Sequence, residues 1–276
     1  MEYPRIYALE TTNRCNAKCS WCPHQQMTRE KKFVDRETVL SVIRYMEDIE
    51  QEYIALHHMG EPLLHPVLDV IIDLFNMRYR RVELSTNGLL LPKKGKMLLE
   101  SCPARVRIAV DFFYKKEGYI DGVKNFLNLA KDYPDTEIHV HTVAGNDLSI
   151  FEGYTSNILL ENKVFDNWAG AVEGESKLSK SNECYFLRDN YVVVMCDGRV
   201  IPCCMDYNGD HVLGTIDDIE NLGKRKPCKL CKKCAKMQFA EGGEWLTDEQ
   251  EIAEIEAYEE MLKQSGEDHK YNNLGG

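Results

Sequence analysis

Short apolar segments alternate with amphipathic segments along most of the chain. Six runs rich in apolar and β-branched residues predict strands, at residues 5–11, 53–58, 81–86, 106–110, 137–143 and 163–168. Segments with apolar residues at helical spacing predict the helices between them, at residues 39–49, 65–78, 92–101, 118–131 and 149–160. Asp35 is placed to cap the first helix, and Pro66 to stand in the first turn of the second.

Strands that alternate with helices imply a parallel sheet with right-handed crossovers. Six strands are too few to close an eight-stranded barrel, so we expect an α/β fold with a partial (β/α)6 TIM-like barrel over residues 1–170. In such sheets a ligand binds beyond the carboxyl ends of the strands. An ordinary doubly wound α/β domain is the alternative architecture.

The pattern changes after residue 170. Residues 170–183 are rich in glycine, serine and charge, which predicts a linker. Residues 191–196 and 199–204 predict two strands of a hairpin, because Asp197-Gly198 between them favours a tight turn. We therefore expect a small cysteine-rich β-hairpin domain over residues 171–240.

The end of the chain and the overall composition are acidic. Residues 247–264 predict a helix with a capping box, so we expect an acidic C-terminal helix and flexible tail over residues 241–276. The net charge of −11 argues against non-specific nucleic-acid binding, which depends on neutralising phosphates. Without a signal peptide or a long apolar run, the eleven cysteines indicate metal ligands in a cytoplasmic protein with no membrane segment.

Three cysteines stand close together after the first predicted strand. Cys15, Cys19 and Cys22 are separated by three residues and then two, and the next cysteine is Cys102. Structural zinc sites usually use two cysteine pairs, whereas [4Fe–4S] clusters are normally held by four thiolates. A cluster on three thiolates leaves one iron open to a ligand from outside the protein. A zinc knuckle is the alternative.

This C-x3-C-x2-C spacing, with Trp21 just before the last cysteine, resembles the cluster loop of radical SAM enzymes. The resemblance implies a catalytic [4Fe–4S] cluster on the three cysteines and S-adenosyl-L-methionine (SAM) as its ligand. Gly60-Glu61-Pro62 resembles the family's stretch for the methionine amino group, and Ser85-Thr86-Asn87-Gly88 the ribose-contacting stretch. Otherwise the first is a loop that starts a helix and the second a turn that ends a strand.

The resemblance points to two further residues. Asp111 follows the fourth predicted strand, where the family often places a polar group against SAM or substrate. Trp168 lies in a stretch similar to one near the adenine in relatives that carry a second cluster. Four histidines at strand positions could face substrate and exchange protons near neutral pH: His57, His58, His139 and His141.

A second cysteine group resembles the SPASM/Twitch extension of radical SAM enzymes. The similarity implies one auxiliary [4Fe–4S] cluster, with Cys184, Cys203, Cys231 and Cys234 as the preferred ligands. Cys204 and Cys228 are the competing ligands, and a zinc ribbon is the competing site. Basic residues around the last cysteines are compatible with an anionic, flavodoxin- or ferredoxin-like electron donor, or simply form a solvated face.

The resemblance implies a radical SAM oxidoreductase. Such an enzyme cleaves SAM reductively, abstracts a substrate hydrogen through a 5′-deoxyadenosyl radical and passes an electron to the auxiliary cluster. No peptide-recognition domain stands ahead of Tyr3, which favours a small-molecule substrate over a leader-bearing peptide. The alternatives are a radical SAM peptide maturase and a non-catalytic iron–sulfur or zinc protein.

Overall fold

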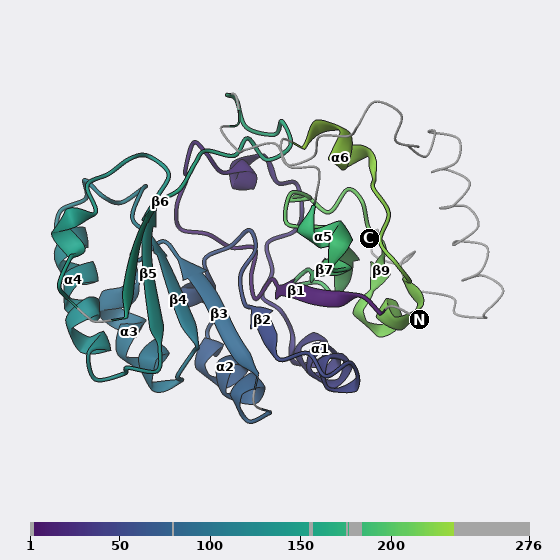
Figure 1. Ribbon diagram of the computed structural model, residues 1–276, viewed down its shortest axis with the longest axis horizontal. Coiled ribbons are helices and arrows are strands. Elements are labelled where there is room, and N and C mark those ends of the chain that lie inside the picture. Colours follow the sequence, from purple (N-terminus) through teal and green to yellow (C-terminus); the bar gives the residue numbers. More distant parts are fainter. Residues whose placement is uncertain (1–2, 79, 155–156, 175, 177–183, 235–276) are drawn as a thin grey trace, which may run out of the picture. The chain divides into compact units, whose positions relative to one another are not determined.

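A computed structural model describes residues 3–78, 80–154, 157–174, 176 and 184–234 (Figure 1). Its strands are β1 (Arg5–Leu9), β2 (Tyr53–Ala55), β3 (Arg81–Thr86), β4 (Arg105–Ala109), β5 (Glu137–Thr142), β6 (Ile158–Asn162), β7 (Tyr191–Val194), β8 (Arg199–Ile201) and β9 (Gly214–Thr215). Its α-helices are α1 (Arg36–Asp48), α2 (Leu68–Asn76), α3 (Leu91–Glu100), α4 (Tyr119–Ala130), α5 (Tyr185–Arg188) and α6 (Lys229–Lys233). Four short 3-10 helices are η1 (Pro23–Gln26), η2 (Pro62–Leu64), η3 (Ser149–Phe151) and η4 (Ile216–Asn221). The acidic helix and tail expected beyond residue 240 lie outside the described residues.

The sheet confirms the predicted α/β architecture. Strands β1 to β6 are parallel and lie side by side in chain order, so the sheet is wound in one direction and stays open. This arrangement is a partial barrel, as the six β/α units predicted, rather than a doubly wound sheet. The carboxyl ends of these strands share one edge, where ligands bind in folds of this kind.

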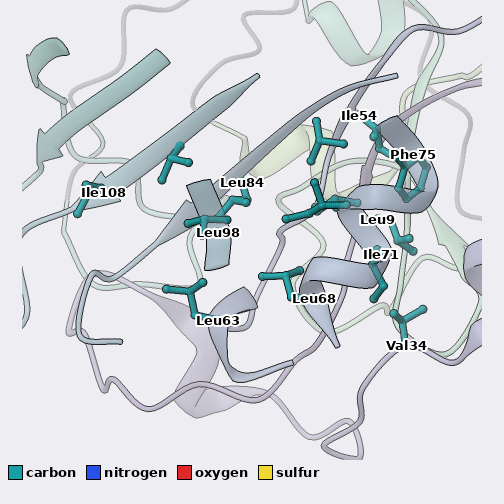
Figure 2. Close-up of a cluster of buried hydrophobic side chains, with 14 of the residues drawn as sticks. Leu9, Val34, Ile54, Leu63, Leu68, Ile71, Phe75, Leu84, Leu98 and Ile108 are labelled. Carbon is teal, nitrogen blue, oxygen red and sulfur yellow. The ribbon is translucent and has the colours of Figure 1, made fainter. Parts of the chain in front are cut away.

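The two faces of the sheet differ in chemistry. One face packs against α1 to α4, as Figure 1 shows, and carries the main apolar core. Figure 2 shows part of that core, in which Ile54 of β2 lies near Phe75 of α2, and Leu84 of β3 lies near Leu98 of α3. The opposite face of β3 to β5 carries charged and imidazole side chains instead. Periodicity of two along each strand separates the two sets.

Local sequence signals predicted the start of α1 correctly and the start of α2 incorrectly. Asp35 caps α1 as predicted, since its side chain accepts a hydrogen bond from the Thr38 amide at 2.8 Å. The prediction for Pro66 was wrong, because α2 begins only at Leu68. The turn before α2 is held by other bonds. The His65 amide donates to the Pro62 carbonyl and closes η2, and the Val67 amide donates to His65 Nδ1.

The predictions for residues 149–160 and 163–168 were wrong. Among the described residues of the range 149–160, only Ser149–Phe151 is helical, as one 3-10 turn, and the sixth strand is Ile158–Asn162. Gly153 adopts a left-handed φ of 73°, a conformation that does not continue a helix. The next apolar residues instead form a strand that pairs with β5, with Ile158 opposite Ile138 and Asn162 opposite Thr142. This pairing satisfies backbone groups that β5 would otherwise leave open.

The predicted hairpin is present and continues the same sheet. Strands β7 and β8 are antiparallel, and Gly198 supplies the left-handed φ of 83° that the tight turn needs. On its other side β7 pairs in parallel with β1, and β9 extends the sheet beyond β8. The barrel strands and the hairpin therefore share one nine-stranded sheet. In the described part of the chain, no helix is long and apolar enough to cross a membrane.

Candidate active site

The three-cysteine loop leaves the sheet at the carboxyl end of β1. The thiols of Cys15, Cys19 and Cys22 are all partly buried. Burial raises the pKa of Cys19 to about 12, and the neighbouring sulfurs of Cys22 and Cys15 raise it further. Burial likewise raises the pKa of Cys22 to about 11, with Cys15 adding to the effect. The loop thus brings three desolvated thiols within electrostatic reach of one another.

This donor set fits an iron–sulfur centre. Soft thiolates are the ligands that such clusters take, and metal binding replaces the proton that each thiol holds. Burial also limits access of water to a bound cluster. Among the residues that the structure describes, no three histidine, cysteine or acidic side chains are placed to share a single metal ion. The fit therefore rests on the chemistry of the three sulfurs.

Gly60 locks the second motif against the cysteine loop. A Cβ at this position would lie 2.0 Å from the carbonyl oxygen of Thr12 and 2.8 Å from that of Arg14, so a side chain is excluded. The close approach lets the Glu61 amide donate a hydrogen bond to the Arg14 carbonyl at 2.8 Å. Pro62 then begins η2. The loop after β2 is thus fastened to the segment just before Cys15.

Glu61 joins the second motif to the third. Its side chain is only 2% exposed, and Oε1 accepts hydrogen bonds from Leu63 N (3.0 Å) and Thr86 Oγ1 (2.7 Å). Oε2 accepts from the Asn87 amide at 2.7 Å. Burial raises the pKa of Glu61, while these hydrogen bonds oppose the shift. The Asn87 side chain donates onward to Asn16 Oδ1 in the cysteine loop at 2.7 Å. Three separate sequence motifs therefore form one hydrogen-bonded unit.

Asp111 lines a cavity beside the loop. Its Oδ1 accepts hydrogen bonds from Thr142 Oγ1 and from the amides of Val143 and Ala144, both at 2.9 Å. Its Oδ2 is buried and, among the described residues, has no hydrogen-bond partner. The cavity has a volume of about 410 Å³ and is lined by Trp21, Asp111, Phe112, Tyr114, Lys115, Ala144 and Asn146. An aromatic pocket with one free carboxylate oxygen suits a ligand that has a flat ring and a donor group.

Trp168 lies against the same loop. Its indole Nε1 donates a hydrogen bond to the Trp21 carbonyl at 3.1 Å. Trp168 and Ala169 both adopt a φ of 53°, which is uncommon for residues other than glycine. The Trp168 amide also bonds to Asp166 Oδ1 at 3.1 Å. The two tryptophans singled out in the sequence therefore meet. Among the described contacts, Ser85, another expected ligand contact, has no polar contact to either tryptophan.

A buried ionic cluster was missed by the sequence analysis. Glu10 is fully buried, and both of its oxygens accept hydrogen bonds from the Arg29 guanidinium at 2.8 Å. His58 Nδ1 lies 3.3 Å from Glu10 Oε1, and the Cys196 amide donates to Oε2 at 3.2 Å. His58 Nε2 in turn lies 3.0 Å from the carbonyl oxygen of Cys204. The only local signal was an acidic residue directly after an apolar strand.

Through Glu10, the cysteine loop is tied to the β7–β8 hairpin, which lies between Cys184 and Cys203 of the second cysteine group. Cys184, Cys203 and Cys204 pack against a small apolar cluster formed by β1, β2, β7 and β8 residues and Phe186. Cys228 and Cys231 lie at the start of α6, with their sulfurs 3.9 Å apart. The contact with Cys231 lowers the pKa of the Cys228 thiol. Burial raises the pKa of the Cys203 thiol, and the neighbouring Cys204 and Cys228 add to the shift.

In this fold a sulfur-rich loop and a ligand cavity meet at the carboxyl edge of an open parallel barrel. The family model described as "Radical SAM superfamily" matches residues 9–146, which is half of the chain. The protein belongs to the Radical SAM superfamily.

Two curated relatives illustrate the similarity. The "Probable GTP 3',8-cyclase" of Methanothermobacter thermautotrophicus is 24% identical over 185 residues, covering 64% of this chain and 58% of the relative. The "S-adenosyl-L-methionine-dependent 2-deoxy-scyllo-inosamine dehydrogenase" of Niallia circulans is 25% identical over 247 residues, covering 82% of this chain and 90% of the relative. The chain thus spans little more than half of the length of the cyclase.

Two solved structures share the fold. BtrN in complex with AdoMet and 2-DOIA superimposes with a TM-score of 0.55 at 19% identity, covering 84% of this chain and 89% of that chain. SuiB of Streptococcus suis bound to precursor peptide SuiA superimposes with a TM-score of 0.57 at 12% identity, covering 89% and 72%. At these identities the likeness concerns the fold alone.

Proposed function

We propose that the protein is a radical SAM oxidoreductase that cleaves SAM reductively and oxidises a small molecule. The observation that carries the proposal is that Glu61 links the three sequence motifs through hydrogen bonds. This carboxylate binds the Thr86–Asn87 stretch, while its own amide binds the backbone just before Cys15. Such a unit holds a cluster-binding loop and a ligand-binding edge in one fixed geometry.

Different residues bind different parts of SAM in this proposal. Cys15, Cys19 and Cys22 would hold a [4Fe–4S] cluster, and this cluster would supply the electron for reductive cleavage of SAM. Gly60-Glu61-Pro62 faces the methionine amino group, where the negative charge of Glu61 favours a cation. Ser85, Thr86 and Asn87 contact the ribose, and Trp21, Asp111 and Trp168 contact the adenosyl group.

The second cysteine group holds one auxiliary [4Fe–4S] cluster in this proposal. Its ligands are Cys184, Cys203, Cys231 and Cys234, and residues 171–240 are its functional domain after the barrel of residues 1–170. Cys228 is the competing ligand, since its sulfur lies 3.9 Å from that of Cys231. An auxiliary cluster bound by these cysteines would supply an acceptor for the second electron of a net dehydrogenation.

The substrate class in this proposal is taken from one curated relative that the chain covers almost in full. That relative is named as a 2-deoxy-scyllo-inosamine dehydrogenase, and 90% of its length aligns with this chain. We therefore favour dehydrogenation of a small hydroxylated molecule, with a flavodoxin- or ferredoxin-like protein as the electron donor in the cytoplasm. Peptide maturation is the alternative, and SuiB supports it only through the shared fold.

Removal of the three loop thiols tests the proposal. Changing Cys15, Cys19 and Cys22 together to alanine should abolish 5′-deoxyadenosine formation and remove about half of the iron, since one of two clusters is lost. The exposed Cys102→Ala variant is the matched control and should retain both. Undiminished 5′-deoxyadenosine in the triple variant would overturn the assignment. Absence of 5′-deoxyadenosine from the reduced wild type would instead support a non-catalytic metal protein.

A further inference from the structure

A cationic and apolar surface lies beside the cysteine loop. The segment that enters the loop and the segment that leaves it are joined by a β-bridge between Thr12 and Phe33. The Arg14 guanidinium donates a hydrogen bond to the Lys31 carbonyl at 2.8 Å and lies 5.1 Å from the centre of the Phe33 ring. Arg14 directly precedes Cys15 in the chain, so this surface begins at the first thiol of the loop.

The loop after β2 continues the surface. The Phe33 ring packs edge-on against the His65 ring, with the two centres 5.3 Å apart. The Val67 amide donates to His65 Nδ1, and Lys94 Nζ of α3 donates to the His65 carbonyl at 3.1 Å. Phe33 and Val67 are 37% and 48% exposed. An aromatic ring and an aliphatic side chain are therefore open to solvent among cations.

Three cations of this surface are not engaged in ion pairs. Among the described residues, the side chains of Arg14, Lys31 and Lys94 have no carboxylate oxygen within 4.0 Å. Lys31 Nζ instead lies 3.5 Å from the carbonyl oxygen of Asn13 and 3.1 Å from His24 Nε2, and neither group carries a negative charge. Their positive charges are therefore available to a partner.

Neighbouring acidic groups offset only part of this charge. Glu30 is already paired with Lys32 at 3.0 Å. Asp35 caps α1, where the positive end of the helix balances its charge. Asp69, in the first turn of α2, is within electrostatic reach of the loop after β2 and offsets one of the three charges. An excess of positive charge thus remains on a chain whose net charge is −11.

The chemistry of the surface selects the kind of partner. Arginine and an aromatic ring are typical anchors of protein–protein interfaces, and opposite charge speeds the encounter of two proteins. Transient electron-transfer complexes bury comparatively little area, so a small surface suffices. An exposed ring and a valine suit a protein surface better than the phosphates of a nucleic acid. The surface therefore fits an acidic protein that binds transiently.

We propose that Arg14, Lys31, Phe33, Val67 and Lys94 form the docking surface for an acidic electron-carrier protein, which reduces the centre on the cysteine loop. The redox role of this partner rests on the proposed function. In this step the carrier gives up one electron, the loop centre gains it, and no atom is transferred. The basic residues of α6, which lie with the second cysteine group, are the rival docking surface.

Binding of a purified acidic flavodoxin tests the surface without turnover. Isothermal titration calorimetry of the reconstituted protein at low ionic strength measures the Kd. Arg14→Glu and Lys94→Glu should each raise the Kd roughly fivefold or more, a difference that shrinks as salt screens the charges. Lys94→Glu lies outside the cysteine loop, so it tests the surface even if Arg14→Glu folds poorly. Lys233→Glu, an exposed cation on α6, is the matched control and should leave the Kd unchanged.

Formation of 5′-deoxyadenosine separates docking from SAM cleavage. With dithionite, a small reductant that needs no docking surface, Lys94→Glu should match the wild type, whereas with reduced flavodoxin it should be slower. An equal Kd in wild type, Arg14→Glu and Lys94→Glu, or a loss confined to Lys233→Glu, would overturn the docking surface. So would absence of wild-type binding, or displacement of flavodoxin by a short DNA duplex. Failure of the wild type to form 5′-deoxyadenosine with dithionite would count against the proposed function instead, whatever the binding result.

Discussion

Arg29→Met tests the buried ionic cluster that ties the cysteine loop to the hairpin. Arg29 and Glu10 have side chains that are 5% and 0% exposed, and the guanidinium donates two hydrogen bonds at 2.8 Å. Methionine fills much of the volume of the arginine stem but leaves the carboxylate unpaired. The substitution therefore removes the positive charge of Arg29 and leaves the buried carboxylate of Glu10 without its cationic partner.

The expected cost is large for a single substitution. Removing one partner of a buried ion pair destabilises proteins by about 3–5 kcal/mol. For a cooperative unit of this size that corresponds to a fall in Tm of about 6–20 °C. His58 and the Cys196 amide also bond to Glu10, so the loss should extend to the hairpin.

The pH dependence has a defined sign. Burial would raise the pKa of Glu10, but the hydrogen bonds from Arg29 and His58 prevail and hold it well below its usual value. A depressed pKa adds stability above the unfolded pKa of about 4.3, and this contribution is lost as the pH falls through the folded pKa. In Arg29→Met the carboxyl protonates more readily. The stability difference between wild type and variant should therefore be greatest near neutral pH and shrink in acid.

Thermal and urea denaturation of the reduced, reconstituted proteins measures these effects. Arg36→Met is the matched control, because the Arg36–Glu37 pair is exposed at 77% and 78% and should contribute at most about 1 kcal/mol. The double variant Glu10→Gln/Arg29→Met removes the stranded charge and should be more stable than Arg29→Met alone. A cost of less than about 1 kcal/mol for Arg29→Met, equal to the control, would refute the reasoning.

Two further predictions concern the proposed ligands. Glu61→Gln keeps the shape of the side chain but removes its charge, so SAM titrated into the reconstituted variant should bind roughly ten- to hundredfold more weakly. The exposed Glu100→Gln variant is the control. Unchanged SAM affinity in Glu61→Gln would mean that Gly60-Glu61-Pro62 is only a helix-entry loop. Changing Cys231 and Cys234 to alanine should expose residues 170–236 to limited proteolysis while the barrel stays folded, because a bound metal centre can contribute on the order of 10 kcal/mol to folding so short a segment. Substrate turnover should then fall more than uncoupled SAM cleavage, and restoration of both by zinc alone would contradict an iron–sulfur cluster there.

The sequence by itself determined the local features of the protein. Period-two runs and helical spacing predicted β1 to β5 and α1, α3 and α4, because these patterns depend on neighbouring residues alone. Asp35 and Asp197-Gly198 act through bonds and turns within a few residues, so the helix cap and the hairpin were predictable. The spacing of Cys15, Cys19 and Cys22 likewise needed no fold to indicate the family.

The tertiary structure decided whatever depends on distant partners. Residues 158–160 suit a helix or a strand equally, and the open edge of β5 selects the strand. Periodicity does not reveal that Glu61 would bind Thr86 and Asn87, or that Glu10 would be buried against Arg29. Pairing of β7 with β1 brings the second cysteine group to the barrel. In each case the physical reason is the same: a buried polar group or an open strand edge must be satisfied, and only the folded chain determines which remote residue can do so.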